Sequence, residues 1–217
     1  MVLQAVVRNV LADPYIVGVH SGASCGAAAA ILFGVGAGVG LQFMAFLGAL
    51  AATALVFFLA RAGGQLTAVR LLLAGVAIGY ALSALTSFMI FASNSPEASR
   101  SVMFWLLGSL SLASWGAPLA TVFVVLAIVT TVLIILSSHI DVLSLGDTSA
   151  LSLGIHPQRF RTFLLLLTCL LIGTLVALSG AIGFVGLVGP HLARRLVGAS
   201  HRVVIPLSGL LGAILVI

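Results

Sequence analysis

The stretch LLLAGVAIGYALSALTSFMIF, residues 71–91, decides the fold class of this chain. It contains no charged side chain, and its apolar residues do not alternate with polar ones as they do in the strands of a membrane β-barrel. A helix rises about 1.5 Å per residue, so about 20 apolar residues cross the roughly 30 Å hydrocarbon core of a bilayer. The stretch therefore predicts a transmembrane helix.

Long uncharged runs recur along the whole chain. Hydrophobic residues make up 62% of the 217 residues and charged residues only 6%, whereas a soluble domain is about 25% charged. No soluble fold of this size hides so much apolar surface, so we expect an all-α, polytopic membrane protein. The uncharged runs cover residues 41–60, 71–95, 101–140 and 162–190.

Turn signals divide these runs into helices. Asp13 followed by Pro14 is typical of a helix start, and GVGAGVG at residues 34–40 predicts a turn. We expect one transmembrane domain over residues 1–217, with about six full or near-full transmembrane helices, partial helices at both ends and further helices beyond them. The expected helices cover residues 14–34, 41–60, 70–92, 117–137, 162–179 and 182–196, with a helix end at 1–9 and a last helix from about 203.

The basic residues indicate the orientation of the chain. All nine are arginines, and with this helix map every one except Arg100 lies on the same side of the membrane. By the positive-inside rule that side is cytoplasmic, and the segment around Arg100 is external. The eight cytoplasmic arginines are Arg8, Arg61, Arg70, Arg159, Arg161, Arg194, Arg195 and Arg202.

The ionisable residues bear on the mechanism of transport. Carriers coupled to protons or sodium usually hold acidic groups within their spans, whereas the four acidic residues here fall at helix ends or in loops. His20 lies near the middle of a helix, either packed or as a proton relay. The chain has no lysine and so no P-loop, which means that a partner must bind any ATP. The acidic residues are Asp13, Glu97, Asp141 and Asp147.

The longest cytoplasmic segment covers residues 138–161. Asp147 can cap a short helix that Gly154 ends, and Pro157 can begin the next one. Two short helices joined at a glycine make a compact projection. Its apolar residues either lie on the membrane surface or dock into a groove of a cytoplasmic partner, and we favour the partner.

The stretch GFVGLVGPHLARRLVGASHR, residues 183–202, turns from glycine-rich to basic. Glycines at three-residue spacing give a short helix a smooth face for close packing. No cysteine or carboxylate accompanies its histidines, so we expect no metal site. We interpret its second half as the cytoplasmic membrane boundary, able to meet lipid phosphates or a partner. The boundary residues are His191, Arg194, Arg195 and Arg202.

Five collinear stretches resemble the FecCD-type permease subunits of type II ABC importers, which take up ferric siderophores, haem and cobalamin. The resemblance covers nearly the whole chain. It implies a ten-helix permease fold, usually paired as a dimer, of which this chain holds the end of the second helix through part of the ninth. The stretches are NVLADPYIVGVHSGAS (9–24), LLLAGVAIGYALSALTSF (71–88), FWLLGSLSLASW (104–115), LSLGDTSALSLGI (143–155) and SGAIGFVGLVGPHLARRLVGASHR (179–202).

The resemblance also implies roles for particular residues. The projection matches the coupling helices that sit in a cleft of the ATPase, through Gly146, Asp147, Ser149, Ala150, Leu151, Leu153, Gly154 and Ile155. The cytoplasmic gate and path match Asn9, Leu11, Ser83 and Ala84, to which Ser87 is added from a stripe of small residues. A short external helix beside the docking surface of a binding protein carries Phe104 and Trp105, with Arg100 as the external arginine.

The implied function is a non-enzymatic permease subunit for a metal chelate, most often an iron(III)-siderophore, in the bacterial inner membrane. The implied partners are a cytoplasmic ABC ATPase dimer that binds ATP and Mg²⁺, an external substrate-binding protein, a second permease copy and membrane lipid. No nucleic acid and no bound cofactor are expected, and there are no catalytic residues. An ion-coupled or facilitative carrier and a non-transporting scaffold stay open as alternatives. Gly189 replaces a larger residue of the family, which we interpret as harmless packing variation.

Overall fold

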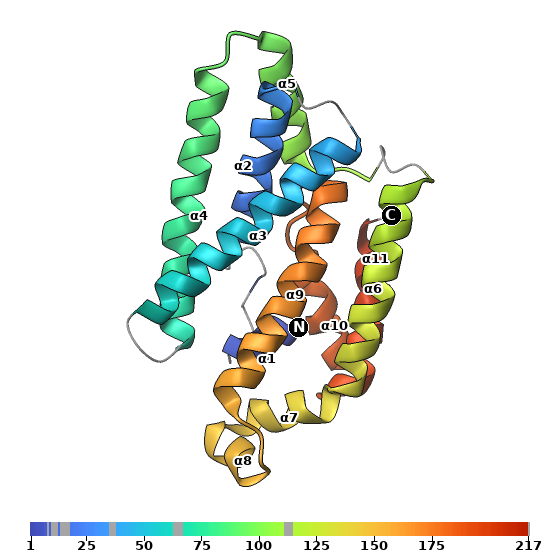
Figure 1. Cartoon of the computed structure of the whole chain (residues 1–217). Coiled ribbons are helices and arrows are strands. Elements are labelled where there is room, and N and C mark those ends of the chain that lie inside the picture. Colours follow the sequence, from blue (N-terminus) through green and yellow to red (C-terminus); the bar gives the residue numbers. More distant parts are fainter. Residues whose placement is uncertain are drawn as a thin grey trace. The chain divides into compact units, whose positions relative to one another are not determined.

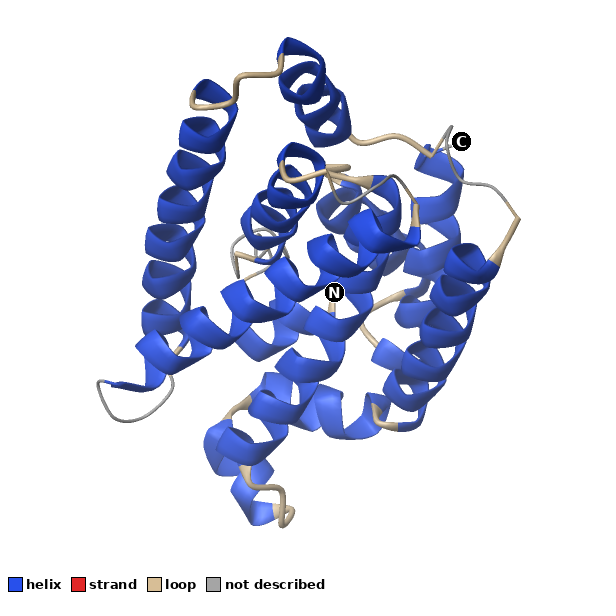
Figure 2. Cartoon of the chain, turned by 45° about the horizontal axis from the view of Figure 1, so that its top comes forward, coloured by secondary structure: helices blue, strands red, loops and turns tan. Residues whose placement is uncertain are grey.

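The computed structural model describes residues 1–7, 9, 13, 18–34, 38–62, 67–110 and 115–216. Within these residues all regular secondary structure is helical, which confirms the expected class (Figures 1 and 2). In chain order the helices are α1 (Val2–Val7), α2 (Val19–Leu32), α3 (Val39–Ala62), α4 (Ala68–Phe91), α5 (Pro96–Leu107), α6 (Ala117–Ile135), α7 (Ser137–Leu145), α8 (Asp147–Ser152), α9 (Pro157–Ser179), α10 (Val185–Val197) and α11 (His201–Val216).

Four of these helices, α3, α4, α6 and α9, are long and apolar enough to cross a membrane, and α2 and α11 are shorter apolar helices. Large apolar side chains stay exposed along the long helices, as a lipid environment requires. Phe58 is 77% exposed, Tyr80 76% and Ile135 71%. The helix start predicted at Pro14 lies outside the described residues.

The chain forms two compact units. The first unit comprises Met1–Asp13, Leu126–Thr168 and Gly183–Ile217, and the second comprises Pro14–Val125 and Cys169–Ile182. Helices α6 and α9 contribute residues to both units. The coupling segment and the boundary residues belong to the first unit, and α2 to α5 belong to the second.

A close crossing of α2 and α3 is the centre of the second unit (Figure 1). A Cβ atom at Gly48 would lie 2.2 Å from the carbonyl oxygen of Gly22, and one at Gly26 would lie 2.2 Å from that of Met44. The backbones therefore touch without a layer of side chains between them, as small-residue motifs in membranes allow. Fully buried alanines such as Ala23 and Ala45 continue the contact.

Helix α5 is longer than the sequence predicted. Ser95 accepts a hydrogen bond from the backbone N–H of Ala98 (3.3 Å) and Pro96 is the first helical residue, so the helix begins well before Phe104, in the segment around Arg100 that was predicted only to be external. After the helix ends at Gly108, the N–H of Ser109 donates to the carbonyl of Ser179 (2.7 Å). This bond ties the end of α5 to the end of α9.

In the first unit α10 and α11 form an antiparallel pair, and both α1 and α11 pack against α7. Gly189 is buried, and a Cβ atom there would lie 3.1 Å from the carbonyl oxygen of Ser208. A Cβ atom at this position would make α10 and α11 adjust by a few tenths of an ångström. The position is thus one where the packing of two helices depends on side-chain size, which is compatible with our interpretation of Gly189 as packing variation.

Candidate functional site

The predicted coupling segment, residues 138–161, contains nearly all of α7, all of α8 and the first residues of α9, and Gly146 joins α7 to α8. Gly146 has φ 136° and ψ 163°, a conformation open essentially only to glycine. Ile140 and Leu143 of α7 are fully buried and fix this helix in the unit. We expected the second short helix after Pro157, but it precedes Gly146, and Pro157 instead begins the long α9.

Gly154 terminates α8, as predicted, from a left-handed position two residues after the last helical residue, Ser152. The N–H of Ile155 donates to the carbonyl of Ala150 (2.9 Å), and the N–H of Gly154, at φ 76°, donates to that of Leu151 (3.0 Å). These two bonds make a Schellman motif, which closes the helix end. The start of α8 differs from the expectation, because its cap position is Gly146 and Asp147 is already its first residue.

An ion pair fixes the first turn of α8 to α9. The carboxylate of Asp147 accepts from both terminal nitrogens of Arg161, at 2.7 and 3.2 Å. The Arg161 side chain is only 13% exposed, whereas that of Asp147 is 47% exposed. A bidentate pair of this kind restricts orientation as well as distance. It holds α8 in one direction relative to the start of α9.

The coupling segment presents apolar side chains to its surroundings. Leu145 is 77% exposed, Leu151 55% and Leu153 66%, while Ala150 is fully buried. Ser149 and Ile155 are half-buried. Leu145 and Leu151 lie on the two short helices and Leu153 directly follows α8, so the three together leave apolar surface that is unfavourable in water, as a docking surface would.

A pocket of about 510 Å³ in the first unit is lined in part by α7, and we call it the polar pocket because most of its lining residues have polar or charged side chains. Its walls come from α1, α7 and the corner between α10 and α11, which are far apart in the sequence. The lining residues are Met1, Gln4, Ala5, Asn9, Asp141, Ser144, Leu145, Arg194, Ala199, Ser200 and His201.

Two polar pairs cross this pocket. Asp141 of α7 accepts from the backbone N–H of His201 (3.2 Å) and contacts its Nδ1. Arg194 of α10 donates from Nη2 to Oε1 of Gln4, which is 5% exposed. Sequence reasoning missed both pairs, because their members are 60 and 190 residues apart.

The four predicted boundary residues differ in their exposure to the surroundings. Arg194, expected to meet lipid or a partner, turns inward to Gln4. His191, Arg195 and Arg202 are exposed, as a membrane-boundary role requires. Among the described residues no three His, Cys, Asp or Glu side chains come together to hold a metal ion.

The predicted gate residues are only partly brought together. Asn9 is exposed and lines the polar pocket, while Leu11 lies outside the described residues. Ser83, Ala84 and Ser87 are exposed on α4 in the second unit, where Ser83 Oγ donates to Ser21 Oγ (3.4 Å).

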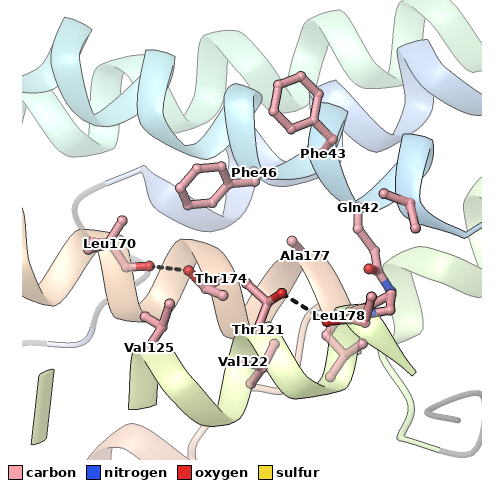
Figure 3. A pocket seen from close by; sticks show the side chains of 13 residues that line it. Gln42, Phe43, Phe46, Thr121, Val122, Val125, Leu170, Thr174, Ala177 and Leu178 are labelled. Carbon is pink, nitrogen blue, oxygen red and sulfur yellow. Dashed lines mark hydrogen bonds between the residues drawn. The ribbon is translucent and has the colours of Figure 1, made fainter. Parts of the chain in front are cut away.

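A second pocket, of about 270 Å³, lies among α3, α6 and α9 in the second unit (Figure 3). Its wall is mostly apolar and includes Phe43, Phe46 and Val122. The hydroxyls of Thr121 and Thr174 donate to backbone carbonyls of their own helices, at 2.8 and 2.7 Å, so neither hydroxyl hydrogen is left to donate to a ligand (Figure 3). An apolar wall of this kind suits hydrocarbon and not a polar chelate.

The predicted external residues lie on one short helix. Arg100 and Phe104 of α5 are exposed, and Trp105 is half-buried. The carbonyl of Trp105 lies 2.4 Å from where a Cβ atom of Gly180 would stand, so α5 packs closely on the segment after α9. This places two of the three side chains at the surface.

The family comparison agrees with this geometry. The model of the FecCD transport family matches residues 1–217. This chain belongs to the FecCD transport family. Together with its apolar helices, this membership makes it a multi-pass membrane protein.

Several characterised proteins resemble this FecCD-family chain. The cobalamin import permease BtuC of Halobacterium salinarum is 41% identical over 97% of this chain and 56% of its own length. The vitamin B12 import permease BtuC of Vibrio cholerae is 41% identical over 99% of this chain and 64% of its own length. The molybdate import permease MolB of Haemophilus influenzae is 37% identical over 98% of this chain and 63% of its own length.

A solved structure shows the same fold as this FecCD-family chain. It is of an ABC transporter assigned to the metal-chelate type, in an inward-facing conformation. The TM-score is 0.90 at 36% identity, over 98% of this chain and 67% of that one. The chain thus spans between about half and two thirds of the length of the proteins that it matches.

Proposed function

We propose that this chain is the membrane-spanning part of a permease subunit in an ATP-driven importer of metal chelates in the bacterial inner membrane. The observation that carries the proposal is the match to the FecCD transport family over residues 1–217, supported by the fold similarity to a metal-chelate-type ABC transporter. The four candidate spans contain no acidic residue, which argues against the alternative of an ion-coupled carrier.

The coupling segment is the proposed docking site of a cytoplasmic ABC ATPase dimer. Exposed Leu145, Leu151 and Leu153 would enter a groove of the ATPase, and the Asp147–Arg161 pair would keep α8 in the docking orientation. ATP and Mg²⁺ bind to the ATPase in this scheme, since the chain has no lysine and hence no P-loop. The permease subunit itself is not an enzyme.

The remaining partners follow from the same proposal. A second permease copy would complete the translocation path, with Ser83, Ala84 and Ser87 of α4 toward it and Asn9 and Leu11 at its cytoplasmic gate. An external substrate-binding protein would dock near Arg100 and Phe104 of α5. Lipid phosphates would meet Arg195 and Arg202 at the cytoplasmic boundary.

Two candidate chelates are proposed. The family resemblance favours an iron(III)-siderophore, and iron-uptake permeases of Bacillus subtilis are 34% and 36% identical to this chain. Cobalamin is the second candidate, because two cobalamin permeases from distant organisms are both 41% identical.

Reconstituted transport tests the proposal. The permease, its ATPase and its binding protein are placed in liposomes with ⁵⁵Fe-ferrichrome or ⁵⁷Co-cyanocobalamin outside. We expect uptake of one chelate that requires internal ATP and is lost when the P-loop lysine of the ATPase is changed to alanine. Uptake driven by a sodium or proton gradient without ATP would contradict the proposal and support the ion-coupled alternative.

A further inference from the structure

Three separate segments of the chain meet at the polar pocket: α1, α7 and the corner between α10 and α11. Helix α7 belongs to the coupling segment, and α1 leads to Asn9, the proposed gate residue. A physical connection between these segments would let a displacement at the ATPase reach the gate. The two polar pairs of the pocket supply such a connection.

Asp141 connects α7 to the corner. His201 is the first residue of α11, so its backbone N–H has no acceptor within that helix. The carboxylate of Asp141 accepts this N–H and also contacts Nδ1 of the same residue, which is the donor because an ionised carboxylate only accepts. The His201 side chain is 12% exposed. Asp141 therefore caps α11 from α7, at the end where the helix dipole favours a negative charge.

Arg194 and Gln4 connect the corner to the gate. Arg194 lies in the last turn of α10, and its guanidinium donates to the side chain of the buried Gln4 of α1. The backbone carbonyl of the same Gln4 accepts a hydrogen bond from the N–H of Asn9 (3.1 Å). Gln4 thus binds the α10–α11 corner through its side chain and Asn9 through its backbone.

We propose that Asp141, His201, Arg194 and Gln4 form a polar relay that passes displacement of the coupling segment to Asn9. The proposal rests on the proposed function, because only an ATPase bound to α7 and α8 would supply the displacement. A hydrogen bond has a preferred length and direction, so two helices that share one tend to move together when one of them is displaced. The four residues act as positioning residues and touch neither substrate nor nucleotide.

The test measures the gate directly and needs no knowledge of the chelate. In the complex of permease and ATPase, with Cys25 and Cys169 changed to alanine, an Asn9→Cys variant is labelled with a maleimide. Labelling is compared with and without ATP plus vanadate. We expect nucleotide to change the labelling rate about fivefold or more, the lower end of typical coupling between sites.

Variants of the relay then separate transmission from folding. His201→Ala is expected to abolish the nucleotide-dependent change in labelling while the ATPase activity of the complex stays within about twofold of its original rate, below the range of typical coupling. His201→Asn, which keeps a donor near the position of Nδ1, is expected to restore the change. Asp141→Ala should lose the nucleotide-dependent change in labelling to the same extent as His201→Ala. The double variant should lose no more of this change than either single variant.

Several outcomes would overturn the relay. The first is a nucleotide-dependent labelling change that persists in His201→Ala, and the second is a loss in the double variant that equals the sum of the two single losses. The third is a parallel loss of the labelling change and of ATPase activity, because that result indicates a purely structural role. If Asp141→Ala does not assemble, Asp141→Asn replaces it, because its amide oxygen still accepts the backbone N–H. If nucleotide does not change the labelling rate of the Asn9→Cys variant with all four relay residues intact, the result counts against the proposed function as well.

Discussion

Glycine has different physical roles at different positions of this chain. At Gly48 the backbone of α3 touches that of α2, and there is no space for a methyl group. At Gly79 of α4 the one described atom within 4 Å of an added Cβ atom would be Ser21 Oγ, at 3.6 Å. Both glycines lie within helices, where alanine is intrinsically preferred. Only the first is required by packing, so the two positions make a matched pair.

Substitution of these two glycines by alanine should have opposite effects. Gly48→Ala forces apart α2 and α3, and overpacking of this kind costs about 1–3 kcal/mol, or roughly 2–12 °C in Tm for a chain of this length. Gly79→Ala gains up to about 1 kcal/mol of helix propensity. Thermal unfolding of the purified permease in detergent measures both. Equal Tm values for the two variants would mean that the α2–α3 contact is looser than the structure has it.

The coupling segment shows how a six-residue helix keeps a fixed direction. An isolated helix as short as α8 is unstable in water, so its neighbours must define it. Gly146 turns the chain at its start, the Schellman bonds at Gly154 close its end, and Asp147 is held by Arg161. The ion pair is the one of these three restraints that a side-chain substitution removes without changing the backbone.

Two arginines of α9 separate the ion pair from general charge effects. Arg161→Ala should destabilise the permease by about 1–3 kcal/mol, because it leaves Asp147 without its bidentate partner and opens a space where a mostly buried side chain lay. Arg159→Ala removes the same charge from an exposed position and should change stability by less than about 0.5 kcal/mol. Thermal unfolding of both variants gives the comparison. A similar effect of both substitutions would assign the loss to net charge instead of the pair.

The predicted orientation of the whole chain depends on which side of the membrane each successive transmembrane helix ends on. Arg100 lies on α5, which has 12 residues and is too short to cross the bilayer, so α5 leaves the alternation of α4 and α6 unchanged. The positive-inside prediction therefore still has Arg100 outside and Arg159 inside. Asn94, between α4 and α5, and Gln158, at the start of α9, are exposed reporters for the two sides.

Cysteine labelling checks this orientation in cells. In the background without Cys25 and Cys169, Asn94→Cys should react with a membrane-impermeant maleimide added outside. Gln158→Cys should react only after the membrane is permeabilised, which also serves as the control for reactivity. The reverse labelling pattern would mean that the chain has the opposite orientation in the membrane. External labelling of both variants would mean that the predicted number of crossings between residues 94 and 158 is wrong.

The sequence predicted helices well where the signal was local. Apolar length and turn residues set the bounds of α3, α4 and α6 to within about two residues, within the usual uncertainty of helix ends. Gly154 was recognised as a helix end because its chemistry is contained in a few neighbouring residues. The start of α5 was not predicted, although Ser95 and Pro96 form an ordinary start signal, and the segment around Arg100 was interpreted only as external.

The polar pairs and the α2–α3 crossing could not be predicted in the same way. Asp141 and His201 are 60 residues apart, and no spacing rule joins residues at that distance. Asp141 had been recognised only as an acidic residue outside the spans. Gly22 and Gly26 do have the four-residue spacing of small residues that favours close packing, but their partner Gly48 is set by tertiary structure.

The contact between Gly22 and Gly48 limits how α2 and α3 can move. Sliding α3 along α2 by one turn would put the long side chain of Met44 where Gly48 now contacts Gly22, and there is no room for it between the two backbones. Rotation about the contact point displaces no such group. The crossing therefore acts as a pivot, and any rearrangement of these two helices during a transport cycle would be a change of angle with its axis at Gly22 and Gly48.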